Sequence, residues 1–252
     1  MPRKKLIAAN WKMYKTPAQA RDFLRAFLPQ VEGHTRDEIV ICPPFVCLPA
    51  AVEEAKRRVG IGAQNLFWEK EGAYTGEISA GMLLDAGCTH VIIGHSERRQ
   101  YFGETDDTVN LKLMTALNAG LVPIVCVGEV LEERESGITE DVLRRQVTNA
   151  LRGISGLQAS TMTIAYEPVW AIGTGKTATP QIAAEAHRII REQTAEALGE
   201  EVAEEMRILY GGSVKPENSS ALMAEIEIDG ALVGGASLDP KSFAGIVKYQ
   251  VR

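Results

Sequence analysis

The sequence predicts a (β/α)8 barrel, in which eight parallel strands close into a cylinder surrounded by helices. Three observations predict it: eight short apolar runs recur along the chain, stretches with helical periodicity separate most of them, and no linker or change of composition interrupts the alternation. Runs that are apolar throughout suit strands buried on both faces. A chain of 252 residues is long enough for one such barrel, so we expect one domain over residues 1–252. A doubly wound open sheet is the alternative that this pattern leaves open.

The expected strands are the apolar runs themselves. In chain order they are Leu6 to Ala9, Ile39 to Cys42, Ile61 to Ala63, Val91 to Ile93, Leu121 to Val127, Met162 to Tyr166, Ile208 to Tyr210 and Ala231 to Val233. The helices between them carry start and stop signals. Thr16-Pro17 and Thr179-Pro180 each place a capping residue before a proline at the first helical position. Asp106-Asp107 opens a further helix that Gly120 closes.

Composition excludes several classes of protein. Apolar residues at 45% and charged residues at 24% are typical of a globular chain, and the net charge of −6 argues against nucleic-acid and anionic membrane partners. No apolar stretch is long enough to cross a membrane. The four cysteines lack metal-site spacing, which favours free buried thiols in a reducing cytoplasm over disulfides.

Polar residues collect directly after the apolar runs, where a barrel of this kind places its chemistry. These segments are Asn10-Trp11-Lys12, Cys42-Pro43-Pro44, Gln64-Asn65, Gly94-His95-Ser96-Glu97, Gly128-Glu129, Glu167-Pro168, Gly211-Gly212-Ser213 and Gly234-Gly235. If the strands close, these segments share one mouth. The same residues without that closure would be ordinary loop positions.

The set at this mouth suits proton transfer beside a carbonyl group. Glu167 can take a proton from carbon, and His95, Lys12 and Asn10 can stabilise the resulting enediolate oxygens. Backbone N–H groups in the glycine turns can bind phosphate. The set therefore predicts a small phosphorylated carbonyl substrate, and it contains no cluster of metal ligands.

Each residue also has a structural interpretation when it is taken alone. His95 is then a hydrogen-bonding turn residue, Lys12 is a solvated charge, and the glycine pairs are ordinary turns. Of the other histidines, His34 and His187 are expected at the surface and His90 at the start of a strand, all three with structural roles.

Residues 167–177 end in Gly175-Lys176-Thr177, which is also the end of a nucleotide-binding P-loop. The first glycine of that motif is missing, because Trp170 occupies its position. The expected helix begins only at Thr179-Pro180, whereas a P-loop enters its helix directly. The sequence therefore argues against an ATP site.

Five segments together resemble triosephosphate isomerases, in order and over almost the whole chain. They are Asn10-Trp11-Lys12, residues 93–99 (IGHSERR), residues 165–176 (AYEPVWAIGTGK), residues 210–214 (YGGSV) and residues 232–238 (LVGGASL). The second and third are highly specific. The resemblance implies a TIM barrel that interconverts dihydroxyacetone phosphate and glyceraldehyde 3-phosphate in glycolysis and gluconeogenesis, without a cofactor or a metal.

The resemblance also implies roles for individual residues. Glu167 corresponds to the general base and His95 to the electrophile, while Asn10, Trp11 and Lys12 belong to the substrate-binding segment and Glu97 orients Lys12 or helps to move protons. The phosphate cradle is expected at Gly173, Ser213, Gly234 and Gly235. Because His95 stands at the start of a short helix, we expect the helix dipole to disfavour its protonated form.

Residues 168–177 are expected to form a lid. Pro168-Val169-Trp170 and Lys176-Thr177-Ala178 are the hinges, and Ala171-Ile172-Gly173-Thr174-Gly175 is the tip that keeps water from the enediolate. An ordinary loop, by contrast, would allow changes at Ile172 or Gly173 without any increase in methylglyoxal, the elimination product.

The long loop 67–77 contains two aromatic residues and a tyrosine, which predicts burial against the barrel or a neighbour. In the family that the chain resembles, this loop enters a partner subunit and Thr75 lies near the partner's catalytic residues, so we expect a homodimer. Two alternatives remain at this point: an aldolase that forms a Schiff base on Lys12, and a barrel that binds phosphosugars without catalysis.

Overall fold

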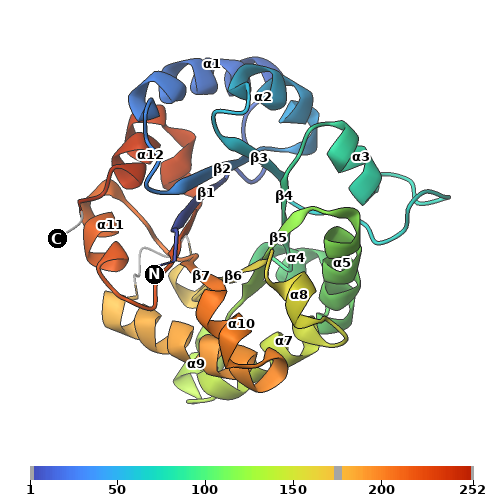
Figure 1. Cartoon of the computed structure of the whole chain (residues 1–252), viewed down its shortest axis with the longest axis vertical. Helices are drawn as coiled ribbons and strands as arrows, with labels where there is room; N and C mark the ends of the chain where they lie inside the picture. The colour runs from blue at the N-terminus through green and yellow to red at the C-terminus, as the bar shows by residue number, and fades with distance from the viewer. Residues whose placement is uncertain (1–2, 173–177, 251–252) are drawn as a thin grey trace.

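The computed structural model describes residues 3–172 and 178–250, and its centre is a closed barrel of eight parallel strands (Figure 1). The strands are β1 (Leu6–Asn10), β2 (Glu38–Cys42), β3 (Gly60–Ala63), β4 (His90–Ile93), β5 (Val122–Val127), β6 (Thr163–Tyr166), β7 (Arg207–Tyr210) and β8 (Gly230–Val233). Each strand pairs with the next, and β8 pairs with β1. The predicted barrel is confirmed, each expected strand boundary lies within one residue of the observed one, and the open sheet is excluded.

Helices surround the barrel on all sides in Figure 1. They are α1 (Pro17–Phe27), α2 (Leu48–Ala55), α3 (Ala80–Asp85), α4 (Ser96–Phe102), α5 (Asp106–Ala119), α6 (Leu131–Glu135), α7 (Thr139–Leu151), α8 (Gly156–Ala159), α9 (Pro180–Leu198), α10 (Glu200–Glu205), α11 (Pro216–Met223) and α12 (Pro240–Val247). Short 3-10 helices cover Leu28–Val31, Phe45–Cys47, Val169–Ala171 and Gly235–Leu238. The predicted caps are present: the side chains of Thr16 and Thr179 accept from backbone amides of α1 and α9, and Gly120 is left-handed after α5.

The apolar side chains form two layers because successive strand residues point to opposite faces. One layer fills the inside of the barrel, where Leu6, Val40, Ile92 and Leu209 meet. The larger layer lies between the strands and the helices. All four cysteines are free and buried, as the sequence predicts. Within the described residues, no helix combines the length and the apolar character that a membrane span requires.

The loop after β3 extends away from the barrel at the right of Figure 1. Its rings pack on one another, with 4.1 Å between the ring centroids of Phe67 and Trp68 and 4.7 Å between those of Phe67 and Tyr74. Tyr74 is nevertheless 44% exposed. The contacts within the loop therefore explain only part of its aromatic content.

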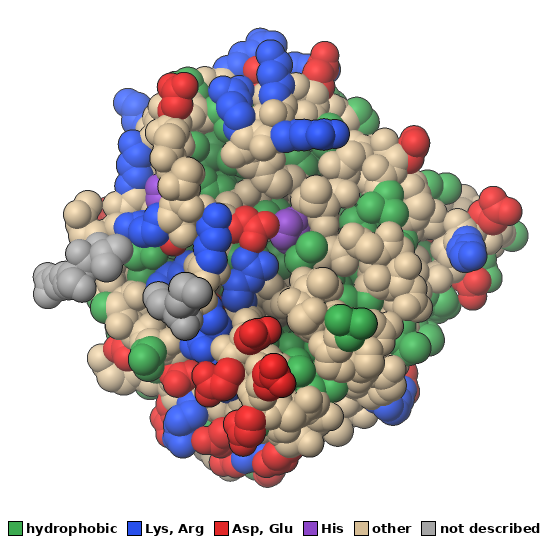
Figure 2. Space-filling model, viewed as in Figure 1, with side chains coloured by type: hydrophobic (Ala, Val, Ile, Leu, Met, Phe, Trp, Pro, Cys, Tyr) green, Lys and Arg blue, Asp and Glu red, His purple; other side chains and the backbone are tan. Residues whose placement is uncertain are grey.

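Charged side chains line the end of the barrel at which the strands begin. Glu38 accepts from Arg207 Nη1 at 2.6 Å and lies 3.3 Å from His90 Nε2, and these three residues are the first of β2, β7 and β4. Side chains of both charges gather near the middle of the face in Figure 2, and acidic ones gather over α10 at its lower edge. This end is thus closed by ion pairs.

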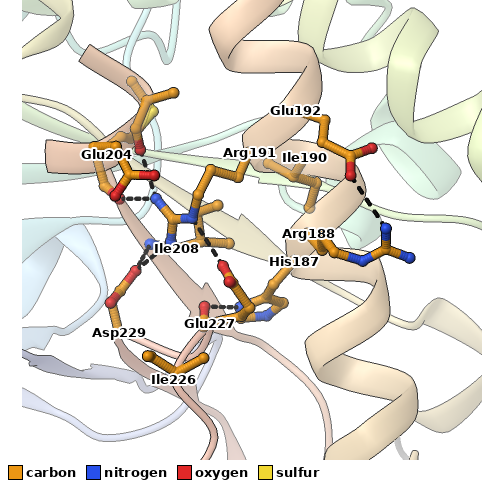
Figure 3. A network of polar contacts seen from close by, with 12 residues as sticks. His187, Arg188, Ile190, Arg191, Glu192, Glu204, Ile208, Ile226, Glu227 and Asp229 are labelled. Atoms are coloured by element: carbon orange, nitrogen blue, oxygen red, sulfur yellow. Dashed lines mark hydrogen bonds and ion pairs between the residues drawn. The ribbon is translucent and has the colours of Figure 1, made fainter. Parts of the chain in front are cut away.

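A buried ion-pair network joins α9 to the strands at the same end (Figure 3). Asp229 accepts from Arg191 Nη2 at 2.9 Å, from Arg3 Nε at 2.7 Å and from the Ile208 amide at 3.0 Å. His187, on the same helix, is fully buried, and its Nδ1 lies 2.9 Å from the Glu227 carbonyl oxygen. The expectation of a surface His187 was therefore wrong. Its burial lowers its pKa to about 4, so it is neutral near pH 7.

Replacing Asp229 by alanine should lower the free energy of unfolding by about 3 kcal/mol or more, because the buried Arg191 guanidinium and the partly buried Arg3 guanidinium lose their carboxylate. Urea unfolding at pH 7 and one protein concentration measures this. Glu204→Ala is the control, since Glu204 is 71% exposed and 3.8 Å from Arg3, and it should cost less than about 1 kcal/mol. Equal losses of unfolding free energy in the two variants would contradict a stabilising role for the Asp229 ion pairs.

Candidate active site

The end of β1 turns back on itself to present Lys12. The Lys12 amide donates to Asn10 Oδ1 at 3.0 Å, and Lys12 has a φ of 52°, a left-handed conformation that costs energy in a residue with a Cβ. Gln64 Nε2 donates to the Lys12 carbonyl at 2.9 Å and holds the turn. The Lys12 ammonium forms an ion pair with Glu97. Its head group is therefore directed toward the start of α4.

His95 and Glu167 meet across the mouth of the barrel. His95 follows β4 and Glu167 follows β6, and Glu167 Oε1 lies 2.9 Å from His95 Nε2. Glu167 Oε2 accepts from the Ser96 amide at 2.9 Å. His95 is 5% exposed and Glu167 is 2% exposed. The Glu167 carboxylate is thus held by donors from two consecutive residues, His95 and Ser96.

The contact between these residues sets the direction of both pKa shifts. Burial opposes the charge of Glu167, but the attraction of His95, its hydrogen bond and the Ser96 amide outweigh burial and lower the pKa of Glu167. Burial likewise disfavours a charged His95, yet the Glu167 carboxylate raises its pKa. The expectation that the start of the helix disfavours a protonated His95 was therefore wrong, because the Glu167 carboxylate raises the pKa of His95. The full negative charge of Glu167, 2.9 Å from His95 Nε2, affects the imidazole more strongly than the partial positive charge at the start of α4.

The hydrogen bonds of the ring nevertheless assign the tautomer of a neutral His95. Its Nδ1 accepts from the Glu97 amide at 3.2 Å, and an accepting nitrogen carries no proton. The ring proton is then on Nε2, which faces Glu167. His95 also precedes α4 directly, as predicted, and caps it. The arrangement presents an N–H donor to the mouth of the barrel.

A cavity of about 390 Å³ lies next to this pair. It is lined by Asn10, Lys12, Tyr14, His95, Glu167, Ala171, Ile172, Gly211 to Lys215, Leu232, Gly234 to Ala236 and Leu238. Gly211 must lack a side chain, because a Cβ there would lie 2.9 Å from Glu167 Cγ. The cavity therefore combines a carboxylate, an imidazole, an ammonium group and two glycine-rich turns.

Most of the predicted site residues line this cavity. Ser213, Gly234 and Gly235 lie on it together with Asn10, Lys12, His95 and Glu167, and Glu97 contacts Lys12 and His95 from α4. Trp11 does not line it. The Trp11 side chain is fully buried, and its Nε1 donates to the Ser237 carbonyl at 3.2 Å.

The expected lid lies partly within the described residues. Val169, Trp170 and Ala171 form a 3-10 turn after Pro168, and Ile172 lines the cavity. Gly173, Thr174, Gly175, Lys176 and Thr177 lie outside the described residues. The expected phosphate contact from Gly173 lies there too.

Glu129 has a role that sequence reasoning did not assign. It is fully buried after β5, and its Oε1 accepts from Trp170 Nε1 at 2.8 Å, Tyr166 Oη at 3.1 Å and Arg134 Nη1 at 3.1 Å. The Val169 amide also donates to its carbonyl at 3.1 Å. Glu129 therefore fastens the expected first hinge to the barrel. Its position at a strand end is the signal that could have identified it.

The described residues contain no group of three or more His, Cys, Asp or Glu side chains that could hold a metal ion. The chemistry that this arrangement supports is proton transfer to and from a bound molecule by a buried carboxylate that lies beside an imidazole N–H donor. The glycine turns beside them offer backbone donors to an oxyanion.

Comparison with known proteins gives one consistent result. The triosephosphate isomerase family model matches residues 5–250. A triosephosphate isomerase of Solibacter usitatus is 58% identical over 98% of this chain and 100% of its own length. The enzyme of Moorella thermoacetica is 57% identical over 98% of this chain and 99% of its own length, and that of Carboxydothermus hydrogenoformans is 54% identical over 99% and 100%.

Replacing His95 by glutamine should raise the pKa of Glu167, because burial then acts against a weaker attraction. In the wild type the lowered pKa stabilises the fold above the unfolded value near 4.5, and this stability is lost as the pH falls through the folded pKa. Carbon NMR titration of labelled glutamate carboxyls measures the shift. His34→Gln should leave it unchanged, since His34 pairs with Asp37 before β2. An unchanged Glu167 titration in His95→Gln would contradict the coupling.

Proposed function

Because the chain belongs to the triosephosphate isomerase family and interconverts dihydroxyacetone phosphate and glyceraldehyde 3-phosphate, we propose that Glu167 is the base and His95 the electrophile of this reaction. The observation that carries the assignment is the 2.9 Å contact between the two side chains beside the cavity of the glycine turns. We propose further that residues 1–252 are one domain. The family match supports this over residues 5–250.

The proposed reaction begins when the Glu167 carboxylate takes a proton from the carbon beside the carbonyl group. The electron pair of that C–H bond moves toward the carbonyl oxygen and gives an enediolate. His95 Nε2–H donates to this oxygen and passes its proton to it, and it recovers a proton from the neighbouring hydroxyl group. Glu167 then returns its proton to the adjacent carbon, which completes the isomerisation without any change in the total number of protons.

Lys12 and Asn10 supply positive charge and a polar group to the substrate oxygens in this proposal. Glu97 is a positioning residue, because its carboxylate pairs with Lys12 while its amide fixes His95 Nδ1. The ion pair suits a charged lysine, whereas a Schiff base requires a neutral amine. It therefore argues against the aldolase alternative.

The backbone at Ser213, Gly234 and Gly235 is the proposed phosphate cradle, together with Gly173. Residues 168–177 are the proposed lid. Two observations on the described residues support this. Ile172 lines the substrate cavity, and Trp170, in the expected first hinge, donates a hydrogen bond to Glu129. Closure of such a lid would exclude water from the enediolate.

We also propose a homodimer in the cytoplasm. The supporting observation is a set of exposed apolar side chains that follow four neighbouring strands, β1 to β4: Met13, Tyr14, Val46, Tyr74, Tyr101 and Phe102. Thr75 lies on the projecting loop among them. A stripe of this kind on one side of the barrel mouth suits a second copy of the chain. Four free buried cysteines suit a reducing compartment.

Glu167→Gln should lower kcat by about three orders of magnitude, because an amide cannot take the proton. A coupled isomerase assay measures the rate in both directions. Glu53→Gln is the control, since Glu53 is 73% exposed and pairs with Arg21 on the outside of the barrel. A Glu167→Gln enzyme with the rate of the control would overturn the assignment. It would leave a barrel that binds phosphosugars without catalysis, or a different base.

Sedimentation at micromolar concentration should give the mass of a dimer for the wild type. Tyr74→Asp should shift it toward the monomer, because the charge enters the centre of the exposed apolar stripe. Leu157→Asp is the matched control, as Leu157 is 86% exposed on α8, away from the stripe. A monomeric wild type would disprove the homodimer.

A further inference from the structure

A second cavity, of about 360 Å³, lies on the other side of Glu167 from the substrate cavity. Among the described residues that line the two cavities, Glu167 alone belongs to both. The walls of the second cavity come from the ends of β4, β5 and β6 and from α4, α6 and α7. It therefore lies between the strands and the helices, and the Glu167 carboxylate separates it from the substrate.

The second cavity offers hydrogen-bond donors that have no partner. Arg99 uses Nε for the Gly94 carbonyl at 3.1 Å and Nη1 for Asp106 at 2.6 Å, but its Nη2 is buried and lacks a partner within residues 3–172 and 178–250. The hydroxyl of Ser96, which also lines the cavity, forms no hydrogen bond to any described residue. An unpaired buried guanidinium N–H is costly, and an anionic acceptor would satisfy it.

The cavity holds groups of both charges, because Arg99 and Arg145 line it together with the Glu133 and Glu167 carboxylates. Arg145 reaches the same Asp106 carboxylate at 3.4 Å, so two guanidinium groups share one negative charge. Glu133 also lines the cavity, but its carboxylate accepts from the Val130 amide at 2.9 Å. Both carboxylates already accept hydrogen bonds from backbone amides, so the group that calls for a ligand is the Arg99 Nη2 donor, which has no partner within the described residues.

The rest of the lining is uncharged, and apart from Gln100 and Gln146 its side chains are apolar or a thiol. Cys126 lies on the wall as a fully buried thiol, and burial raises its pKa well above the usual value, so it carries no charge. Val127, Val130 and Val169 complete this side. A ligand that fits both sides has one anionic head for Arg99 and an apolar body for these side chains.

We propose that this cavity is a second binding site, which takes a small monocarboxylate with an apolar body and acts on Glu167 from behind. The ligand carboxylate binds Arg99 Nη2 and the Ser96 hydroxyl, and its body lies against Cys126 and Val169. Ser96 also holds Glu167 Oε2 through its amide. An occupant at this corner therefore limits the movement of the base toward the substrate and lowers kcat, while the substrate cavity stays open and KM stays unchanged.

Benzoate is a suitable probe, because it joins one carboxylate to one apolar ring. Calorimetric titration should give a dissociation constant in the millimolar range, and saturating inorganic phosphate should not displace benzoate. Arg145→Gln should weaken binding by about tenfold because a positive charge at the rim is lost, and Arg99→Lys should weaken it by about tenfold because lysine keeps the charge but lacks the Nη2–H donor. Arg188→Gln is the control, since Arg188 is 59% exposed on α9 and its ion pair within the described residues is with Glu192.

The calorimetric test of benzoate binding does not depend on the proposed catalytic roles. The expected fall in kcat does depend on them. Benzoate binding that responds to the arginine variants without any fall in kcat would keep the site and reject its action on Glu167. Displacement of benzoate by phosphate, or binding that both arginine variants leave unchanged, would overturn the site itself. Arg145 lies at the rim and is 56% exposed, so its variant remains informative if Arg99→Lys fails to fold.

Discussion

The arrangement of this protein depends on the buried carboxylate of Glu167, which accepts one hydrogen bond on each oxygen from the described residues. Glu167 is 2% exposed, and a buried carboxylate is stable only when donors replace the water it has lost. His95 and the Ser96 amide supply one donor for each oxygen. The backbone around it is correspondingly crowded: a Cβ on Gly128 would lie 1.8 Å from the Glu167 carbonyl oxygen. Gln146 holds that glycine through its amide and its carbonyl, so the backbone beside Glu167, the proposed base, is held from α7 as well.

The barrel separates stability from chemistry by assigning them to opposite ends. At the end where strands begin, charges are paired with one another, as in the contacts of Asp229 with Arg191 and of Glu38 with Arg207. At the end where strands finish, the same kinds of residue are left available to a ligand. Parallel strands make this division possible, because every strand delivers its last residue to one mouth.

Much of this could be predicted from the sequence. The apolar runs located all eight strands, and the residues after them located Lys12, His95 and Glu167, because the barrel places strand ends together. His187 was misplaced, since helical periodicity does not show which polar residue the helix turns inward. The pKa of His95 was misjudged because it depends on a carboxylate 72 positions along the chain, whose 2.9 Å distance no local pattern contains. The second cavity could not be predicted from the sequence either, because it depends on how strands and helices pack together.

The two buried carboxylates at the mouth, Glu129 and Glu167, differ in how easily they can move. Glu129 receives three donors on a single oxygen, and all three belong to the protein. A movement of Glu129 would leave the buried Tyr166 hydroxyl and the partly buried Trp170 and Arg134 donors unpaired at once, which makes it a fixed support. Glu167 has one donor for each oxygen, and one of them is His95 Nε2–H, which a substrate oxygen can occupy instead. In the proposed mechanism the substrate takes over the hydrogen bond from His95 that Glu167 gives up, so the Glu167 carboxylate can leave its position at little cost only when substrate is present.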